Sequence, residues 1–187
     1  MNHSYRRKTY SAGVLPFCYD NEGNILFLLG KDTCENTWSD FGGRAENRDY
    51  GNKAFTAARE FYEESMGTVI NIQQMKTLLK DKKNFTMITT KTLNGSPYYT
   101  FITKIEYKEY SEEFAKRREF NIYADMSDKF LEKKEIRWVT KETLLNSLDR
   151  NDLIALRHVF KSTMKKKKSV ISDIGVGTLV DSVCSEF

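Results

Sequence analysis

The chain has 187 residues, 30% of them charged, which suits one domain with a sizeable core. A formal net charge of +4 is too small to indicate a nucleic-acid-binding protein by itself. Three widely spaced cysteines and two histidines argue against a zinc site or a disulfide framework and favour the cytoplasm, and the N-terminal residues hold no apolar run that would span a membrane.

The first third of the chain predicts two strands, a loop and a helix. Residues 9–31 contain two apolar segments on either side of a short turn, which is typical of paired strands. Residues 53–66 place small and aromatic side chains at helical spacing, and Gly67 follows where a helix stop is expected. The apolar face of this helix consists of Ala54, Ala57, Ala58 and Phe61.

The remainder of the chain predicts further strands, followed by helices. The expected strands cover residues 68–75, 84–93, 96–107 and 135–140, and a hairpin turn joins the second and third of these. The expected helices cover residues 112–126, 141–148 and 152–164. This mixture predicts an α+β or α/β fold, with a mixed central sheet and helices on its faces. We expect one domain over residues 1–164 and a basic run and tail at 165–187.

Three glutamates crowd one face of the helix predicted at 53–66. Residues four apart on a helix lie about 40° apart around its axis, so Glu60, Glu63 and Glu64 share one side. Their mutual repulsion disfavours this arrangement unless a cation is present, and Mg²⁺ prefers such oxygen ligands. Arg59 precedes Glu63 by four residues and can orient its carboxylate. A solvated acidic face paired with Arg59 is the plain alternative, and these residues alone favour it.

The surrounding residues resemble the signature of the Nudix hydrolase family. That signature runs Gly, five residues, Glu, seven residues, Arg-Glu, a hydrophobic residue, any residue, Glu-Glu, any residue and Gly. Gly43 matches its first glycine, and Asp49 stands in the position of its first glutamate. The helical half of the signature is matched by Arg59, Glu60, Phe61, Glu63 and Glu64.

The chain departs from the signature in two places. Nine residues separate Asp49 from Arg59 where the family has seven, and two separate Glu64 from Gly67 where the family has one. Both departures lie outside the helical ligand core, so the glutamates keep their relative spacing. The longer loop leaves open whether Asp49 or Glu46 fills the first carboxylate position.

The resemblance covers about residues 9–160, because the strands before the signature and the segment 135–144 follow the order of the family. It implies a Nudix-type α/β/α sandwich. It also implies a hydrolase that cleaves a pyrophosphate bond in a nucleoside diphosphate linked to another group, with Mg²⁺ or Mn²⁺. By resemblance, the metal ligands are Glu60, Glu63, Glu64 and the backbone carbonyl of Gly43, and Arg59 holds the carboxylates in place.

The general base and the substrate contacts are less closely defined by the resemblance. Glu64 is one candidate for the base, and Glu132 or Glu135 in a later loop are others, although either alone is more readily explained as a solvated glutamate. The glycine pair before the helix lets the backbone approach a ligand. The candidate substrate-binding residues are Phe41, Gly42, Arg44 and Tyr99.

The substrate itself is left open by the signature. A nucleotide-like small molecule is expected, while basic runs at 80–83, 115–119 and 165–168 mildly favour a polyanion such as capped RNA or a diphosphoinositol polyphosphate. Solvated surface is the favoured explanation of these runs. The rival class is an inactive Nudix-fold module that binds nucleotide or RNA, which the complete set of glutamates disfavours. A monomer or homodimer is expected.

Overall fold

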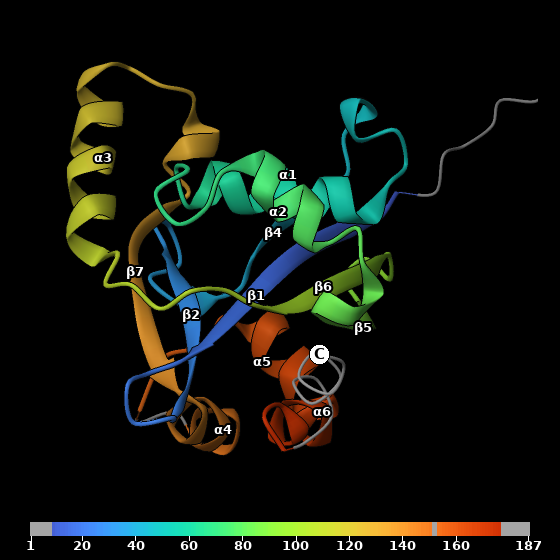
Figure 1. Cartoon of the computed structure of the whole chain (residues 1–187). Coiled ribbons are helices and arrows are strands. Elements are labelled where there is room, and N and C mark those ends of the chain that lie inside the picture. Colours follow the sequence, from blue (N-terminus) through green and yellow to red (C-terminus); the bar gives the residue numbers. More distant parts are fainter. Residues whose placement is uncertain (1–8, 151–152, 177–187) are drawn as a thin grey trace, which may run out of the picture.

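The computed structural model describes residues 9–150 and 153–176. Within these residues a mixed sheet of seven strands forms the middle layer of the molecule, with helices on both faces (Figure 1). The strands are β1 (Ser11–Tyr19), β2 (Ile25–Asp32), β3 (Trp38–Ser39), β4 (Phe41–Arg44), β5 (Phe85–Lys91), β6 (Pro97–Lys104) and β7 (Lys133–Thr140).

Strand β1 lies at the centre of the sheet, and its first eight residues are all buried. The path through the sheet is β3-β2-β1-β6-β5, with β4 also paired to β1 and β7 to β2. Strands β1 and β6 run parallel, whereas β4 and β2 pair with β1 in the antiparallel sense. This topology places the short strand β4 beside β1, where it faces the first long helix.

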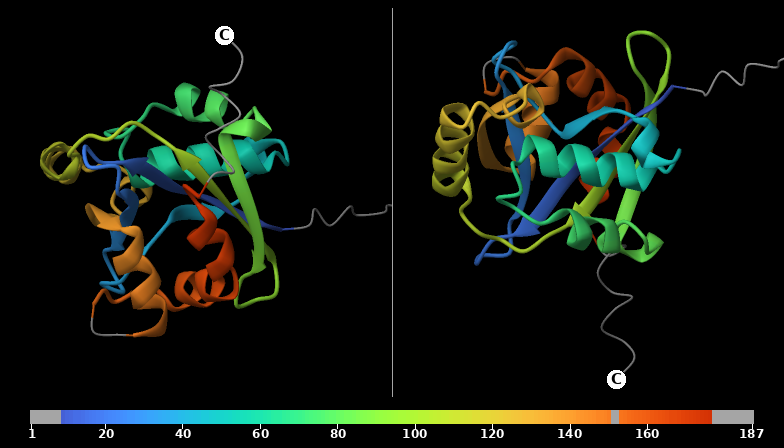
Figure 2. Two further views of the ribbon diagram at one scale, coloured as in Figure 1. Left: turned by 60° about the horizontal axis from the view of Figure 1, so that its bottom comes forward. Right: turned by 90° about the horizontal axis from the view of Figure 1, so that it is seen from above.

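Helices cover the two faces of the sheet unequally (Figure 2). On one face lie α1 (Lys53–Glu64) and α2 (Ile72–Leu78), and on the other lie α4 (Lys141–Asp149), α5 (His158–Lys166) and α6 (Lys168–Asp173). Helix α3 (Ser111–Tyr123) stands at the edge of the sheet beside β7. Each face has its own buried apolar cluster. The expected α/β/α sandwich with a mixed sheet is therefore confirmed.

Local hydrogen bonds and backbone conformation define the two ends of helix α1. The Asn52 side chain accepts hydrogen bonds from the first turn of the helix and caps it. Ala57, Ala58 and Phe61 are fully buried against the sheet, as their spacing predicted. The helix ends at Glu64, and both Met66 and Gly67 then have positive φ angles of 53° and 66°. The extra residue near the end of the signature is thus absorbed in the helix stop.

Two sequence predictions were wrong in this part of the fold. Residues 68–75 contain helix α2 instead of a strand, because Asn71 and Gln74 form a reciprocal capping box that starts a helix at Ile72. The helix expected at 152–164 begins only at His158. Two residues before it, Leu156 forms an isolated parallel bridge with Trp38.

The C-terminal part of the described chain packs on the domain. The expected domain boundary after residue 164 falls inside α5, and Ile171 and Ile174 of the expected tail are buried in the core on the α4–α6 face. Residues 177–187 of that tail lie outside the described residues. Across residues 9–150 and 153–176, none of the helices has the length and apolarity that a membrane crossing requires.

Candidate active site at the junction of β4 and α1

The glycine pair of β4 allows the carboxylates of α1 to reach the strand. A Cβ atom on Gly43 would lie 2.6 Å from Glu60 Oε2, so only glycine leaves room for that carboxylate. The backbone N–H of Gly42 donates a 2.7 Å hydrogen bond to Glu64 Oε2. Phe41, one residue earlier, packs its ring edge-on against Phe61 at a centroid distance of 5.0 Å and is fully buried. Together these contacts fix the acidic face of α1 against β4.

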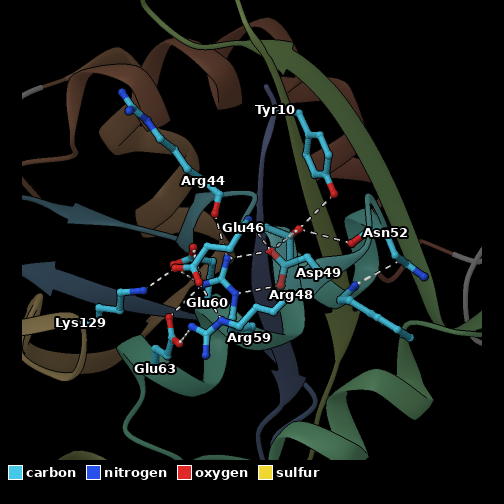
Figure 3. A network of polar contacts seen from close by, with 12 residues as sticks. Tyr10, Arg44, Glu46, Arg48, Asp49, Asn52, Arg59, Glu60, Glu63 and Lys129 are labelled. Carbon is cyan, nitrogen blue, oxygen red and sulfur yellow. Dashed lines mark hydrogen bonds and ion pairs between the residues drawn. The ribbon is translucent and has the colours of Figure 1, made fainter. Parts of the chain in front are cut away.

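Arg59 is the central cation of the site (Figure 3). Its buried guanidinium donates from Nε and Nη2 to the two oxygens of Asp49, both at 2.9 Å. Nη1 lies 2.8 Å from Glu60 Oε1 and 2.9 Å from Glu63 Oε2. Nη2 also donates to the backbone carbonyl of Arg44 at 2.8 Å. One side chain therefore holds together the loop, the end of β4 and two glutamates of the Nudix signature. We call the signature residues from Gly43 to Gly67 the box.

The structure answers which acidic residue pairs with this arginine. Asp49 is buried and also accepts hydrogen bonds from the Thr56 hydroxyl and the Glu46 N–H. Burial favours a raised pKa for Asp49, but the bonds from Arg59 and these other donors bring its pKa below the ordinary value. Glu46 is partly exposed, pairs with Arg48 and Lys129, and lies at the longer distance of 3.7 Å from Arg59 Nη1. Asp49 thus fills the buried carboxylate position, and Glu46 lies on the rim.

The lengthened loop contains a left-handed turn. Tyr50 and Gly51, directly after Asp49, have φ angles of 52° and 75°. Glycine adopts this conformation without cost, and Tyr50 tolerates it with its side chain 86% exposed. The two extra residues therefore form a turn in solvent and leave the Asp49–Arg59 pairing intact.

Glu60 and Glu64 are buried carboxyl groups with perturbed acidity. Burial raises the pKa of Glu60 to about 7; Arg59 opposes the rise, and repulsion from Glu63 and Glu132 adds to it. Burial raises the pKa of Glu64 to about 8, with Lys133 opposing the rise. Both values show that the positive charges of the protein only partly compensate these carboxylates.

Sequence reasoning missed Lys133, the first residue of β7. Its side chain is 1% exposed, and Nζ donates to Ser39 Oγ at 2.9 Å and lies 3.5 Å from Glu64 Oε1. A lysine within a run of charged residues gives no signal of burial. The available signal was Gly30 in an otherwise apolar strand, where a Cβ would meet Lys133 Cδ at 3.0 Å.

Asp40 was also missed. It is buried between β3 and β4, and its carboxyl accepts a 2.9 Å hydrogen bond from the Tyr98 hydroxyl. Burial raises the pKa of Asp40. A cavity of about 50 Å³ lies beside it, between β6 and α5, and Arg157 is among the residues that line it. This cavity borders Gly42 and therefore adjoins the box from the α5 face.

The four predicted substrate contacts do not converge in the structure. Phe41 is part of the core, out of reach of a ligand, whereas Arg44 is exposed at the end of β4. Gly42 lines the small cavity on the α5 face. Tyr99 lies instead on the α1 face, with its ring 6.0 Å from that of Tyr10, in an open groove of about 610 Å³.

Two of the candidates for the general base differ in their surroundings. The charge of Glu132 raises the pKa of both Glu60 and Glu64. Glu135 is partly exposed and lies 3.5 Å from Lys31 across β2 and β7. The choice among Glu64, Glu132 and Glu135 therefore stays a prediction.

The donor set suits a hard divalent cation in its chemistry. Glu60, Glu63, Glu64 and the carbonyl of Gly43 offer only oxygen atoms, which Mg²⁺ and Mn²⁺ prefer. In the part of the chain that the structure describes, no three His, Cys, Asp or Glu side chains are arranged as a preformed metal cage. The carboxylates are turned toward arginine and lysine instead. The residues fit a metal after side-chain rearrangement.

Comparison with known proteins identifies the fold. No protein-family model and no curated protein matches the sequence. An Ap4A hydrolase of C. elegans matches the structure at TM-score 0.50 and 15% identity, over 87% of this chain and 98% of its own. A Nudix hydrolase of Nitrosomonas europaea matches at TM-score 0.50 and 16% identity, over 93% and 76%. The chain has the Nudix fold.

The Nudix fold does not by itself assign an activity to this chain. A structure of the C-terminal domain of mouse MUTYH in complex with human PCNA also matches, at TM-score 0.51 and 12% identity, over 88% of this chain and 90% of that chain. At identities of this size the likeness establishes the fold alone. The activity has to be argued from the box and its surroundings.

The two raised pKa values predict that the metal-free protein loses stability as the pH rises. At pH values between the ordinary pKa of 4.5 and the raised pKa, which is about 7 for Glu60 and about 8 for Glu64, the folded chain binds more protons than the unfolded chain. We expect the free energy of unfolding to fall by a few kcal/mol from about pH 5 to about pH 8. Urea denaturation across this range measures it.

The matched control for this pH dependence is the Glu60→Gln, Glu64→Gln double variant, which has neither titrating carboxyl. Its stability should change less with pH over the same window. An equally steep pH dependence in this variant would contradict the assignment of the effect to these two groups.

Proposed function

We propose that this protein is a Mg²⁺- or Mn²⁺-dependent hydrolase that cleaves a pyrophosphate bond in a nucleoside diphosphate linked to another group. The observation that carries the proposal is the junction of β4 and α1. There, within a Nudix fold, Glu60 and Glu63 pair with the buried Arg59, and Glu64 accepts a hydrogen bond from the backbone of Gly42. A solvated acidic helix face does not account for carboxylates that are buried at this junction.

Each residue of the junction has a defined part in the proposal. Glu60, Glu63, Glu64 and the Gly43 carbonyl would hold the divalent cation. When bound, the cation neutralises phosphate charge and activates the attacking water. Arg59 orients Glu60 and Glu63 while Asp49 holds Arg59 in turn. The backbone N–H of Gly42 and the buried Lys133 fix Glu64 from the side of the sheet.

The proton acceptor in this proposal is Glu64 or Glu132. Glu64 of α1 accepts a hydrogen bond from the backbone N–H of Gly42 in β4. Glu132 is exposed on the segment that leads into β7, and its charge raises the pKa of Glu60 and Glu64. An exposed carboxylate exchanges protons with bulk water more readily than a buried one. Glu135, paired with Lys31, is not part of the proposal.

A polyanionic substrate such as capped RNA is a second candidate, favoured by helix α3. This helix exposes Phe120 and Tyr123, at 60% and 91%, and carries three basic residues, Lys116, Arg117 and Arg118, in the turn before them. Exposed aromatic side chains near basic ones are typical of surfaces that bind single-stranded nucleic acid. The Arg118 guanidinium donates to the Lys133 carbonyl, which fixes α3 to the strand that begins beside the box.

The proposal includes a single catalytic domain that acts in the cytoplasm as a monomer or homodimer. The cytoplasmic location is supported by the sequence composition and by the free thiols of Cys18 and Cys34. Residues 165–176 contribute to this domain by packing α6 and Ile174 into its core.

A substrate panel tests the proposed function. The full chain is incubated with Mg²⁺ or Mn²⁺ and ADP-ribose, a dinucleoside polyphosphate, capped RNA or a diphosphoinositol polyphosphate, and the products are identified. We expect cleavage of one class, and none of it by the Glu63→Gln, Glu64→Gln double variant. Full activity of the double variant, or tight binding without cleavage of any compound, would refute the proposal; the second result would indicate a binding module.

A further inference from the structure

Arg48 reaches from the lengthened loop to the carboxylates of α1 (Figure 3). It lies in the short helix η1 (Asn47–Asp49), and its Nη2 is 2.5 Å from Glu63 Oε1. Its Nε donates to Glu46 Oε2 at 2.7 Å. The Arg48 side chain is 54% exposed, whereas the Glu63 side chain is 7% exposed. A solvent-facing cation therefore covers a buried carboxylate.

Both oxygens of Glu63 are occupied in this arrangement. Oε2 accepts from Arg59 at 2.9 Å, and Oε1 accepts from Arg48. A divalent cation at Glu63 would have to share an oxygen with an arginine, whose positive charge repels it, or displace one of the two arginines. This explains in part why the box glutamates do not form a preformed metal cage.

The two arginines differ in how easily they can be displaced. Arg59 is buried and is also held by Asp49 and by the carbonyl of Arg44. Removing it would take a buried cation from Asp49, Glu60 and Glu63 at once. Arg48 has solvent on one side, and among the described residues its other ion-pair partner is the rim residue Glu46. An ion pair with one solvent-exposed partner is weaker than the fully buried pairs of Arg59, so Arg48 is the exchangeable arginine.

We propose that Arg48 is an internal counter-ion that holds Glu63 Oε1 in the metal-free protein and leaves when a divalent cation binds there. The inference rests on the proposed function, because it assumes that Glu63 is a metal ligand. Arg48 lowers the affinity for the cation in two ways: it occupies a ligand oxygen and it adds positive charge beside the site. In return, it keeps a buried carboxylate paired while the site holds no metal.

Arg48 lies between two residues of the loop that have other anchors. Glu46 also pairs with Lys129, and Asp49 is fixed to Arg59. Departure of Arg48 from Glu63 therefore requires movement of its exposed side chain alone, while both anchors of the loop stay in place.

Calorimetric titration of Mn²⁺ into the metal-free full chain, without substrate, tests this inference. We expect Arg48→Ala to bind Mn²⁺ about fivefold more tightly than the wild type, the size of effect that a weak, partly exposed ion pair allows. The control is Arg117→Ala, which removes the same charge from the exposed surface of α3 and should leave the affinity unchanged. Equal or weaker binding by Arg48→Ala would overturn the inference.

A double-variant cycle separates contact with Glu63 from a general effect of charge. In a Glu63→Gln background, Arg48→Ala should no longer tighten Mn²⁺ binding, because the carboxylate that couples them is gone. A persisting fivefold effect would overturn the role of Glu63. Absence of Mn²⁺ binding by every folded variant would remove the proposed metal site itself, whereas equal binding by wild type and Arg48→Ala would remove only the role of Arg48.

Discussion

Replacing Arg59 with methionine is expected to lower the free energy of unfolding of the metal-free protein by about 3–5 kcal/mol. The substitution keeps the length of the side chain and removes the charge that pairs with Asp49, Glu60 and Glu63. Each of these carboxylates is buried and would lose its main cation. Urea denaturation followed by circular dichroism measures the change.

Arg48→Met is the matched control for the Arg59 variant. Arg48 also contacts Glu63, but its side chain faces solvent, so its removal should cost no more than about 1 kcal/mol. Equal losses of stability from the two substitutions would contradict the description of Arg59 as the buried centre of the site.

The second large effect is expected on activity. Glu64→Gln should lower kcat for the cleaved pyrophosphate substrate by about 10²-fold or more, because it removes a charge from the proposed metal and base position. Glutamine has the same size, and its side-chain oxygen can still accept the hydrogen bond from the Gly42 N–H. The fold should therefore be retained, which thermal denaturation would verify alongside steady-state kinetics.

Two further variants show what the loss of activity means. Glu142→Gln on α4, at the opposite face of the sheet, should leave kcat unchanged within about twofold. Glu132→Gln should flatten the dependence of kcat on pH if Glu132 is the base, and leave it unchanged if Glu64 is. Wild-type kcat in the Glu64→Gln variant would exclude Glu64 from the chemistry.

The core of the site could be predicted from the sequence because it is local. Helical periodicity alone places Glu60, Glu63 and Glu64 on one side of α1, and the structure keeps them together. The pairing of Asp49 with Arg59 could not be predicted, because it depends on the turn that Tyr50 and Gly51 make. A tyrosine gives no sequence signal for a left-handed conformation.

The remaining features depend on contacts between distant segments. Lys133 is buried because β7 pairs with β2, which brings its side chain to Ser39. Asp40 is covered by Tyr98 of β6, a strand from a distant part of the sequence. No local pattern reveals either contact. The predicted substrate residues are separated because neighbouring strand residues such as Phe41 and Gly42 face opposite sides of the sheet. Residues 68–70 looked like a strand from their β-branched side chains, but the cap at Asn71 favoured a helix.

The most direct test of the metal-dependent hydrolase is the hydrolysis rate of the wild-type chain as a function of free Mn²⁺, on the substrate that the panel selects. The rate should be zero in the presence of a chelator. It should then rise along the same saturation curve as Mn²⁺ binding measured without substrate, and the Glu60→Gln, Glu64→Gln variant should show neither curve. Hydrolysis that persists with the chelator, or saturable Mn²⁺ binding that the two substitutions leave unchanged, would contradict a metal-dependent centre at the junction of β4 and α1.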